Sequence, residues 1–378
     1  MSSYISFNKP YVSGNEINYI SQVLSGAMQS GDGPFTKRCH EWFVSKLSCR
    51  NALLTNSCTT SLEMAALLCD IQPGDEIIMP SYTFVSTANA FVLRGGVPVF
   101  VDIREDTLNL DEGLVEEAVT PRTRVIVPVH YAGVACEMES IMDIAKRKNL
   151  KVVEDAAQGI MATYKGKALG TIGDLGCYSF HETKNISCGE GGALLVNNPA
   201  LVTSAEIIWE KGTDRRTFVK GLIDKYTWQD LGSSFLPSEV TAAYLLAQLE
   251  IANYITQQRL SIWQLYHDLL QPLEQIGLLR RPIVPPECKH NAHMYYVILA
   301  PGINKQKVLA ELIRNNIVST SYYVPLHSSP GGHKYARMQG QLNNTVNHSN
   351  RLVRLPIWVG LSVDQQKFIV EVLRNTIN

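Results

Sequence analysis

The sequence lacks the features that define several classes of protein. Its 34 Lys and Arg residues are balanced by 35 Asp and Glu residues, so there is no excess of positive charge to bind nucleic acid or an anionic membrane. No apolar run is long enough to cross a bilayer, and the first residues show neither the charged start nor the apolar stretch of an export signal. We therefore expect a cytoplasmic protein with no nucleic-acid partner and no membrane partner.

The signatures of metal sites and disulfide frameworks are also missing. The eight cysteines are dispersed without a CxxC pair, and the nine histidines show no HExxH motif and no zinc-site spacing. Dispersed cysteines in a chain of 378 residues are typical of reduced thiols. We expect no metal cofactor.

The composition that remains is that of a globular protein, with 45% hydrophobic and 18% charged residues. Short β-rich runs alternate with helical stretches over about the first half of the chain. The expected strands are 76–79, 97–101, 125–129, 152–154, 177–180 and 193–196, and the expected helices are 57–68, 114–119 and 138–148. Nearly continuous apolar strands separated by helices predict an α/β fold whose mostly parallel sheet is covered on both faces.

The second part of the chain predicts one long helix and a smaller unit. Helical periodicity runs from about 237 to 270, and Pro272 marks its expected end. One face of this helix is expected to carry Val240, Ala243, Tyr244, Ala247 and Ile251. A proline-rich connector at 280–286 precedes an expected strand at 294–299 and helices at 306–315 and 363–375. We predict a large domain over residues 1–250 and a smaller C-terminal α/β domain over residues 251–378.

Three segments carry residues with chemical potential. Segments 154–158 and 179–185 each follow an expected strand, and open α/β sheets bind ligands at the carboxyl ends of their strands. Segment 55–61 begins a helix and is rich in small hydroxylated residues, so its free N–H groups would attract phosphate. Taken alone, segment 55–61 is explained better by ordinary capping of the helix.

Asp155 and Lys184 give these segments a specific chemistry. Asp155 would end a buried strand, and its charge would need a partner such as a protonated pyridine nitrogen or a structural cation. Lys184 follows an apolar strand, where a neutral amine could form an imine with an aldehyde cofactor, although a lone lysine is more often a surface residue. A phosphate site, a partner for a pyridinium and an imine-forming lysine are together what pyridoxal 5′-phosphate (PLP) requires from a protein.

Five motifs resemble the sugar-nucleotide aminotransferases of the DegT/DnrJ/EryC1/StrS family, and the similarity covers essentially the whole chain. They are PSYTFVSTANA (80–90), VHYAG (129–133), VVEDAAQG (152–159), SFHETKN (179–185) and GEGG (189–192). The resemblance implies the fold of PLP-dependent type I aspartate aminotransferases, with a large domain built on a mostly parallel mixed sheet and a smaller C-terminal α/β domain. It also implies a homodimer.

The resemblance assigns roles to individual residues. Lys184 would be the catalytic residue that bonds to the cofactor, Asp155 would pair with the pyridine nitrogen, and Gln158 would lie near the 3-hydroxyl group. Phe84 would stack on the cofactor ring. The remaining cofactor contacts would be Ser179, Cys58, Thr59 and Thr60 at the phosphate, with Ser233 or Ser234 reaching it from the second subunit. Substrate contacts would come from His181, Tyr323 and His327, although ordinary packing explains Tyr323 and His327 equally well.

The reaction implied by the resemblance is a ping-pong transamination. L-Glutamate would give its amino group and leave as 2-oxoglutarate, and dTDP-4-keto-6-deoxy-D-glucose would become dTDP-4-amino-4,6-dideoxy-D-galactose. The product would serve cell-surface polysaccharides such as enterobacterial common antigen or the lipopolysaccharide O-antigen. Three alternatives stay open: a sister enzyme that makes the gluco epimer or aminates a 3-keto sugar, a dehydratase of the same fold in which a histidine usually replaces the lysine, and a non-catalytic protein that retains the fold.

Overall fold

The computed structural model describes residues 4–26 and 28–377, and the start of the chain, where an export signal was sought, lies partly outside them. The described residues form one eight-stranded sheet and two three-stranded sheets. Within these residues no helix has the length and apolar character needed to span a membrane.

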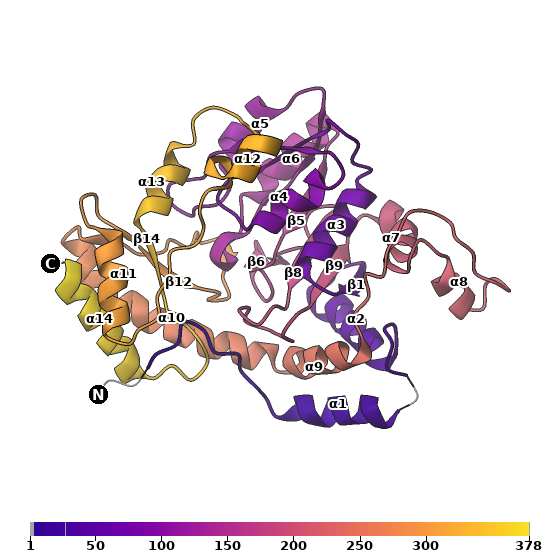
Figure 1. The fold of residues 1–378 in the computed structure, drawn as a ribbon, viewed down its shortest axis with the longest axis horizontal. Helices are drawn as coiled ribbons and strands as arrows, with labels where there is room; N and C mark the ends of the chain where they lie inside the picture. The colour runs from indigo at the N-terminus through magenta and orange to yellow at the C-terminus, as the bar shows by residue number, and fades with distance from the viewer. Residues whose placement is uncertain (1–3, 27, 378) are drawn as a thin grey trace.

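The large sheet is mixed and mostly parallel, as the sequence predicts (Figure 1). From β8 to β13 each neighbouring pair is parallel, whereas β9 is antiparallel to both β1 and β8. The expected run 125–129 ends as a strand at Ile126, and Val129 makes only an isolated bridge to Asp155. The order across the sheet is β1 (Asn51–Thr55), β9 (Gly192–Val196), β8 (Leu175–Ser179), β5 (Lys151–Asp155), β4 (Thr123–Ile126), β2 (Glu76–Pro80), β3 (Val97–Val101) and β13 (Arg337–Met338).

Helices cover both faces of this sheet because its strands are apolar on both sides. Alternate residues of β2 show this: Ile77 and Met79 pack into the core on one face, and Ile78 packs into the core on the other. The first face is covered by α3 (Cys58–Leu68), α4 (Val85–Val92) and α7 (Val202–Trp209). The second is covered by α2 (Pro34–Leu47), α5 (Val115–Ala118), α6 (Met138–Lys148) and α9 (Glu239–Glu250).

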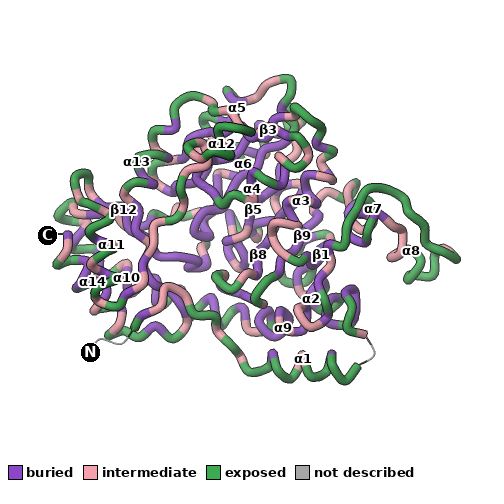
Figure 2. Tube along the Cα trace, viewed as in Figure 1, coloured by how far each residue is buried: buried purple, intermediate pink, exposed green. Residues whose placement is uncertain are grey.

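The single long helix expected over 237–270 is two helices, α9 and α10 (Ala252–Gln275), separated at Ile251. The expected apolar face of α9 does pack on the core, through Ala243, Val240 and Ile251. The other side of α9 is buried as well, because α9 lies between α1 (Asn15–Ser25) and α2 (Figures 1 and 2). Pro272 does not end α10. A proline removes one backbone donor, but the last turn still closes through the bond from the Ile276 N–H to the Pro272 carbonyl at 3.3 Å.

The C-terminal part has its own core. An antiparallel sheet of β10 (Leu279–Arg280), β12 (Tyr295–Leu299) and β14 (Leu352–Leu355) packs on α10, α11 (Lys305–Arg314) and α14 (Val363–Ile377). The strand and the two helices expected here are confirmed within two residues. The other described elements are α8 (Arg215–Val219), α12 (Pro330–Tyr335), α13 (Asn343–Arg351) and the small sheet of β11 (Cys288–Lys289), β6 (Thr163–Tyr164) and β7 (Lys167–Ala168).

Two connections tie this second core to the first. Near the N-terminus, Ile5 forms a bridge with Ile317 and belongs to the C-terminal core. In the opposite direction, β13 joins the edge of the large sheet, and Arg337 donates two hydrogen bonds to the buried Glu76 carboxylate at 2.8 and 3.0 Å. The domain boundary near residue 250 stays a prediction.

Candidate active site

Neighbouring carboxylates at the end of β5 point to opposite faces of the sheet and have different surroundings. Glu154 is fully buried and accepts hydrogen bonds from the backbone N–H groups of Gly170, Ile172 and Gly173 at 2.6–2.7 Å. His130 donates a fourth at 2.8 Å, because its other ring nitrogen accepts from the Cys136 N–H. With four donors Glu154 is a structural residue that fixes the loop after it.

Asp155 has fewer partners. One carboxylate oxygen accepts from the Thr87 hydroxyl at 2.7 Å and the other from the Ala157 N–H at 3.1 Å. The side chain is 5% exposed, and no cation pairs with it among the described residues. A buried carboxylate with two neutral donors retains the capacity to bind a positively charged group.

Thr87 and Thr83 are site residues that the sequence reasoning did not identify. Thr83 lies just before α4 and Thr87 lies in its first turn, and their hydroxyl groups are 2.8 Å apart. The Thr87 hydroxyl therefore accepts a hydrogen bond from the Thr83 hydroxyl and donates one to the Asp155 carboxylate. Both threonines belong to the motif 80–90, but Thr83 precedes the helix, so helical spacing does not predict their contact.

Lys184 lies in the turn that follows β8. Its backbone N–H donates to the carbonyl of His181 at 2.9 Å, and among the described residues its amine has no hydrogen-bond or ion-pair partner. Burial lowers the pKa of the Lys184 amine, and the nearby positive charge of Arg354 lowers it further, whereas negative charge on Cys58 or Asp155 would raise it. The neutral form of the Lys184 amine is thus favoured relative to that of an exposed lysine, and the amine lies close enough to Asp155 and to Cys58, the first residue of α3, for their charges to act on it.

The N-terminus of α3 offers free backbone donors. Ser57 caps the helix through the Thr60 N–H at 3.2 Å, and the Thr60 hydroxyl accepts in return from the Ser57 N–H at 3.1 Å. The N–H groups of Cys58 and Thr59 have no acceptor in the described part of the chain. Two unpaired N–H groups at the positive end of a helix form a natural anion site.

Strand β9 lies directly against this helix start. A Cβ atom added at Gly192 would lie 2.4 Å from the Ser57 carbonyl oxygen and 2.5 Å from the Cys58 nitrogen, so only glycine fits. Gly192 pairs with Ser179, the last residue of β8. The GEGG motif thus allows the close backbone approach that brings Ser179 beside the N-terminus of α3.

Gln158, Tyr323 and Phe84 come together from three distant segments. The Gln158 amide oxygen accepts from the Ala132 N–H at 2.7 Å, and its nitrogen donates to the Tyr323 hydroxyl at 3.1 Å. The rings of Tyr323 and Phe84 are 6.2 Å apart, and Phe84 is 56% exposed at the start of α4. Tyr323 is therefore placed at the site by Gln158, and burial raises the pKa of its hydroxyl.

The other candidate residues have local partners. His181 contacts the Thr183 hydroxyl at 2.9 Å, and His327 contacts the Ser81 hydroxyl at 2.7 Å. Ser233 and Ser234 are exposed, and the Ser234 carbonyl accepts from the Asn56 side chain at 3.1 Å, two residues before α3 begins. Their contacts with substrate or with a second subunit stay predictions.

A second set of residues missed from the sequence supports Lys184 and Gln158 from behind. The Asn185 side chain donates to the Asn291 carbonyl at 2.8 Å and accepts from His293 at 3.1 Å. The Asn291 side chain donates to the Gln158 carbonyl at 2.7 Å. The loop before β12 thus fixes the turns that carry both site residues, a long-range contact with no local sequence signal.

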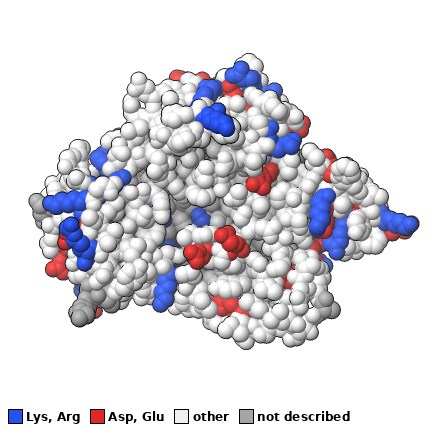
Figure 3. All heavy atoms as spheres, in the orientation of Figure 1, with Lys and Arg blue, Asp and Glu red and all other residues white. Residues whose placement is uncertain are grey.

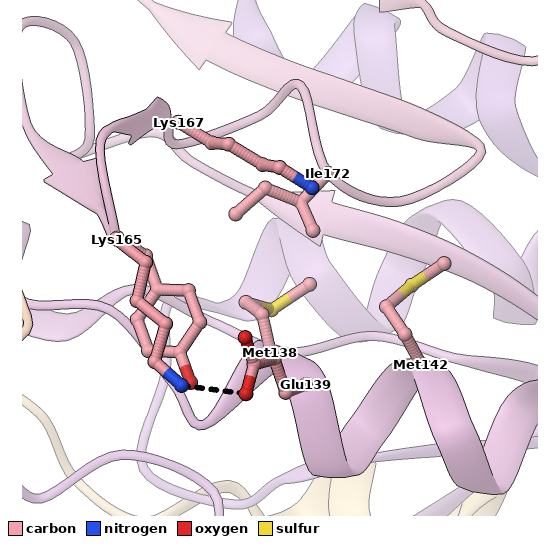
Figure 4. Close-up of a pocket in the computed structure, with 7 residues that line it drawn as sticks. Met138, Glu139, Met142, Lys165, Lys167 and Ile172 are labelled. Carbon is pink, nitrogen blue, oxygen red and sulfur yellow. Dashed lines mark hydrogen bonds and ion pairs between the residues drawn. The ribbon is translucent and has the colours of Figure 1, made fainter.

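The molecule is hollowed near the centre of the face drawn in Figure 3, where acidic and basic side chains are visible beside and within the hollow. A separate cavity of about 300 Å³ lies between α6 and the β6–β7 hairpin (Figure 4). It shares no residue with the candidate site, and its only ion pair joins Lys165 to Glu139 at 2.5 Å. Its lining is Met138, Glu139, Met142, Tyr164, Lys165, Lys167 and Ile172.

Comparisons with known proteins found both similar sequences and similar structures. A family model described as the DegT/DnrJ/EryC1/StrS aminotransferase family matches residues 10–374. GDP-perosamine synthase from Caulobacter vibrioides is 33% identical over 329 residues, which cover 86% of this chain and 86% of that protein.

Solved structures match over the whole chain. DesV from S. venezuelae, in complex with a ketimine intermediate, has a TM-score of 0.90 and 26% identity and covers 100% of this chain and 99% of that one. The PLP form of Spr1654 from Streptococcus pneumoniae has a TM-score of 0.90 and covers 99% of each chain, and at 22% identity this second likeness concerns the fold alone.

Proposed function

The chain belongs to the DegT/DnrJ/EryC1/StrS aminotransferase family, and from this premise we propose that it transfers the amino group of L-glutamate to dTDP-4-keto-6-deoxy-D-glucose. The enzyme is a sugar aminotransferase that depends on PLP. The observation that carries the proposal is the grouping of Lys184, Asp155 and the free N-terminus of α3 around one site.

The residues present fit PLP. The unpaired N–H groups of Cys58 and Thr59, with Ser179 beside them, would hold its phosphate. Asp155 would hold its pyridine nitrogen, Phe84 would cover its ring, and Lys184 would hold it covalently. When bound, PLP supplies an electron sink for the negative charge that develops while the amino group is transferred.

Lys184 would also move the proton in both half-reactions. Its lowered pKa leaves a larger neutral fraction than an exposed lysine has. A neutral amine at this position would take the proton from Cα of glutamate and would later deliver a proton to C4 of the sugar. Asp155, held by Thr87, would keep its negative charge directed at the ring nitrogen throughout.

The product we propose is dTDP-4-amino-4,6-dideoxy-D-galactose. Residues 61–96 (SLEMAALL to LRGG), 127–139 (VPVHYAGVACEME) and 291–296 (NAHMYY) are the stretches in which the chain resembles dTDP-4-amino-4,6-dideoxygalactose transaminase. The gluco epimer and a 3-amino sugar are the alternatives. The face from which Lys184 delivers the proton decides between the epimers.

The experiment that tests this proposal is a panel of keto-sugar nucleotides incubated with ¹⁵N-glutamate and the holoenzyme. The panel includes dTDP-linked 4-keto and 3-keto sugars and a GDP-linked 4-keto sugar. NMR should find ¹⁵N on C4 of the dTDP sugar in the axial, galacto configuration. Label in the equatorial position, at C3, or only on the GDP sugar would contradict the proposed substrate and product.

We further propose a homodimer whose contact includes the arm of residues 211–234. This arm, which contains α8, projects from the body of the molecule and is largely exposed (Figures 1 and 2). Trp228 is 79% exposed and Leu222 is 71% exposed, and exposed apolar groups of this size mark interaction surfaces. A second copy is the occupant we propose, because the arm ends at Ser233–Ser234, beside the N-terminus of α3.

Sedimentation tests the homodimer. Trp228→Asp and Leu222→Asp should convert a dimer into a monomer at micromolar concentration, whereas Ile313→Asp, at an exposed apolar site on α11, should not. If both arm variants remained dimeric, that result would contradict the proposed contact.

The cytoplasm is the location we propose, in keeping with the eight free cysteines. The product would enter enterobacterial common antigen or O-antigen synthesis.

A further inference from the structure

Arg354 is a half-buried cation without an anionic partner. It lies on β14, and its Nε atom is buried with no hydrogen-bond partner. Within residues 4–26 and 28–377 no carboxylate or carbonyl group binds its guanidinium. The guanidinium carbon lies 5.0 Å from the centre of the Phe7 ring and 5.8 Å from the centre of the Tyr322 ring.

The nearby Arg259 shows how this protein satisfies a buried guanidinium. Arg259 is 4% exposed and donates to the carbonyl oxygens of Ala292, His293 and Ile357 at 2.8–3.2 Å. A half-buried guanidinium without such acceptors keeps its hydrogen-bond donors free for an anion, because the rings of Phe7 and Tyr322 offer it attraction but no acceptor. The difference between Arg259, which has three carbonyl acceptors, and Arg354, which has none, indicates that Arg354 is available to bind a ligand.

The position of Arg354 places this ligand beside the reacting groups. Its charge acts on Lys184, where it opposes protonation of the amine, and on the Tyr323 hydroxyl, which binds Gln158. Tyr322, under the guanidinium, is the chain neighbour of Tyr323. Arg354 is thus contributed by the C-terminal sheet, whereas Asp155 and Lys184 belong to the end of β5 and the turn after β8 of the large sheet.

We propose that Arg354 binds a carboxylate group of the amino donor, an inference that rests on the proposed transamination. The cofactor phosphate is accounted for by the N-terminus of α3, and the reacting ring of the keto sugar is uncharged. Glutamate alone brings a carboxylate next to the atom that reacts. A guanidinium binds a carboxylate through two parallel hydrogen bonds, which also orients the donor.

The two half-reactions separate this role from the others that an arginine could have. Holoenzyme in the PLP form is mixed with glutamate, and enzyme loaded with pyridoxamine phosphate is mixed with the keto-sugar nucleotide, each followed by absorbance in a stopped-flow instrument. In Arg354→Gln the glutamate half-reaction should slow about 10- to 100-fold at low glutamate, the effect of losing a charged hydrogen bond, with the sugar half-reaction nearly unchanged. Arg354→Lys should recover part of the loss.

A binding measurement and a matched control complete the test. Glutarate, a dicarboxylate without an amino group, should bind the wild-type PLP form in a calorimeter and bind Arg354→Gln about 10-fold or more weakly. Arg314→Gln, at an exposed arginine paired with Glu311, should leave glutarate binding and both half-reactions at wild-type values.

Three results would overturn the proposal. Equal slowing of both half-reactions would indicate that Arg354 only supports the fold through Phe7 and Tyr322. Slowing of the sugar half-reaction alone would assign Arg354 to the diphosphate of the sugar nucleotide. Unchanged kinetics would leave it without a ligand. Failure of the transamination itself is distinguishable, because the wild-type enzyme would then not react with glutamate at all.

Discussion

The adjacent carboxylates of β5 predict opposite outcomes from two conservative substitutions. Glu154→Gln replaces an oxygen that accepts two hydrogen bonds with an NH₂ group that can accept none. Whichever way the amide is turned, two buried donors lose their acceptor. Each stranded donor costs about 1–3 kcal/mol, so the free energy of unfolding should fall by about 2–6 kcal/mol.

Asp155→Asn should leave stability nearly unchanged and remove activity. The asparagine oxygen still accepts from the Ala157 N–H, and its NH₂ group can donate to the Thr87 hydroxyl, which can rotate. A neutral amide cannot stabilise a protonated pyridine nitrogen, so kcat/KM should fall by at least about 100-fold, the equivalent of about 3 kcal/mol.

Urea unfolding of both variants and steady-state transamination measure the two effects separately. A fall of about 2–6 kcal/mol is a large part of the roughly 5–15 kcal/mol that stabilises a typical domain, so Glu154→Gln should show a clearly lower urea midpoint. An Asp155→Asn enzyme with activity within 10-fold of wild type would refute the assignment of Asp155. A Glu154→Gln protein as stable as wild type would refute the account of the buried acceptor.

Three further predictions concern other contacts. Hydrogen bonds from Arg337 lower the pKa of the Glu76 carboxyl from its ordinary value near 4.5 to about 2, so the stability that this carboxylate contributes should be complete above pH 4.5 and lost as the pH falls toward 2. The difference in unfolding free energy between wild type and Glu76→Gln, measured by urea unfolding, should therefore shrink over that pH range. A difference that stays constant with pH would contradict this prediction. Gly192→Ala should weaken PLP binding at least about 10-fold by pushing strand β9 off the start of α3, whereas Gly331→Ala, where a Cβ meets no atom within 4 Å, should bind PLP as wild type does in a fluorescence titration. Thr87→Val should raise the dissociation constant of PLP about 5- to 20-fold by removing a donor from the carboxylate it holds, and a wild-type constant would show that this hydroxyl has no part in the site.

Much of the fold could be predicted from local patterns. The helix at 138–148 has the bounds of α6. The expected start at Ser57 is the cap of α3, because serine is a capping residue that the sequence shows directly. The partner of each strand could not be predicted in this way. The pairing of β1 with β9, and of β13 with β3, joins residues more than a hundred positions apart and depends on packing.

The break between α9 and α10 at Ile251 also depends on packing and not on local sequence. The helical periodicity continues through it, and no proline or glycine marks it, so the sequence predicts one helix. In the fold, α9 packs between α1 and α2 and α10 packs on the C-terminal core. Tertiary packing on two separate cores thus overrides the local pattern.

The candidate site likewise contains residues that the sequence identifies and residues that only the structure identifies. Lys184, Asp155 and the start of α3 are visible as motifs because each follows a strand or begins a helix. Thr87 and Asn291 act through contacts made across the fold, so their roles depend on distances that the sequence does not contain. For Arg354 the sequence shows only a single arginine in the apolar run 352–355. Its interest appears in the structure, where its Nε atom is buried without a hydrogen-bond partner.

The most direct test of this account is the attachment site of the cofactor. Holoenzyme is treated with borohydride, digested and analysed by mass spectrometry, with Lys184→Ala as the matched control. The account predicts the mass of reduced phosphopyridoxyl on the peptide that contains Lys184, and no labelled peptide in the variant. A label on any other lysine, or an unlabelled wild-type protein that still transfers amino groups, would contradict it.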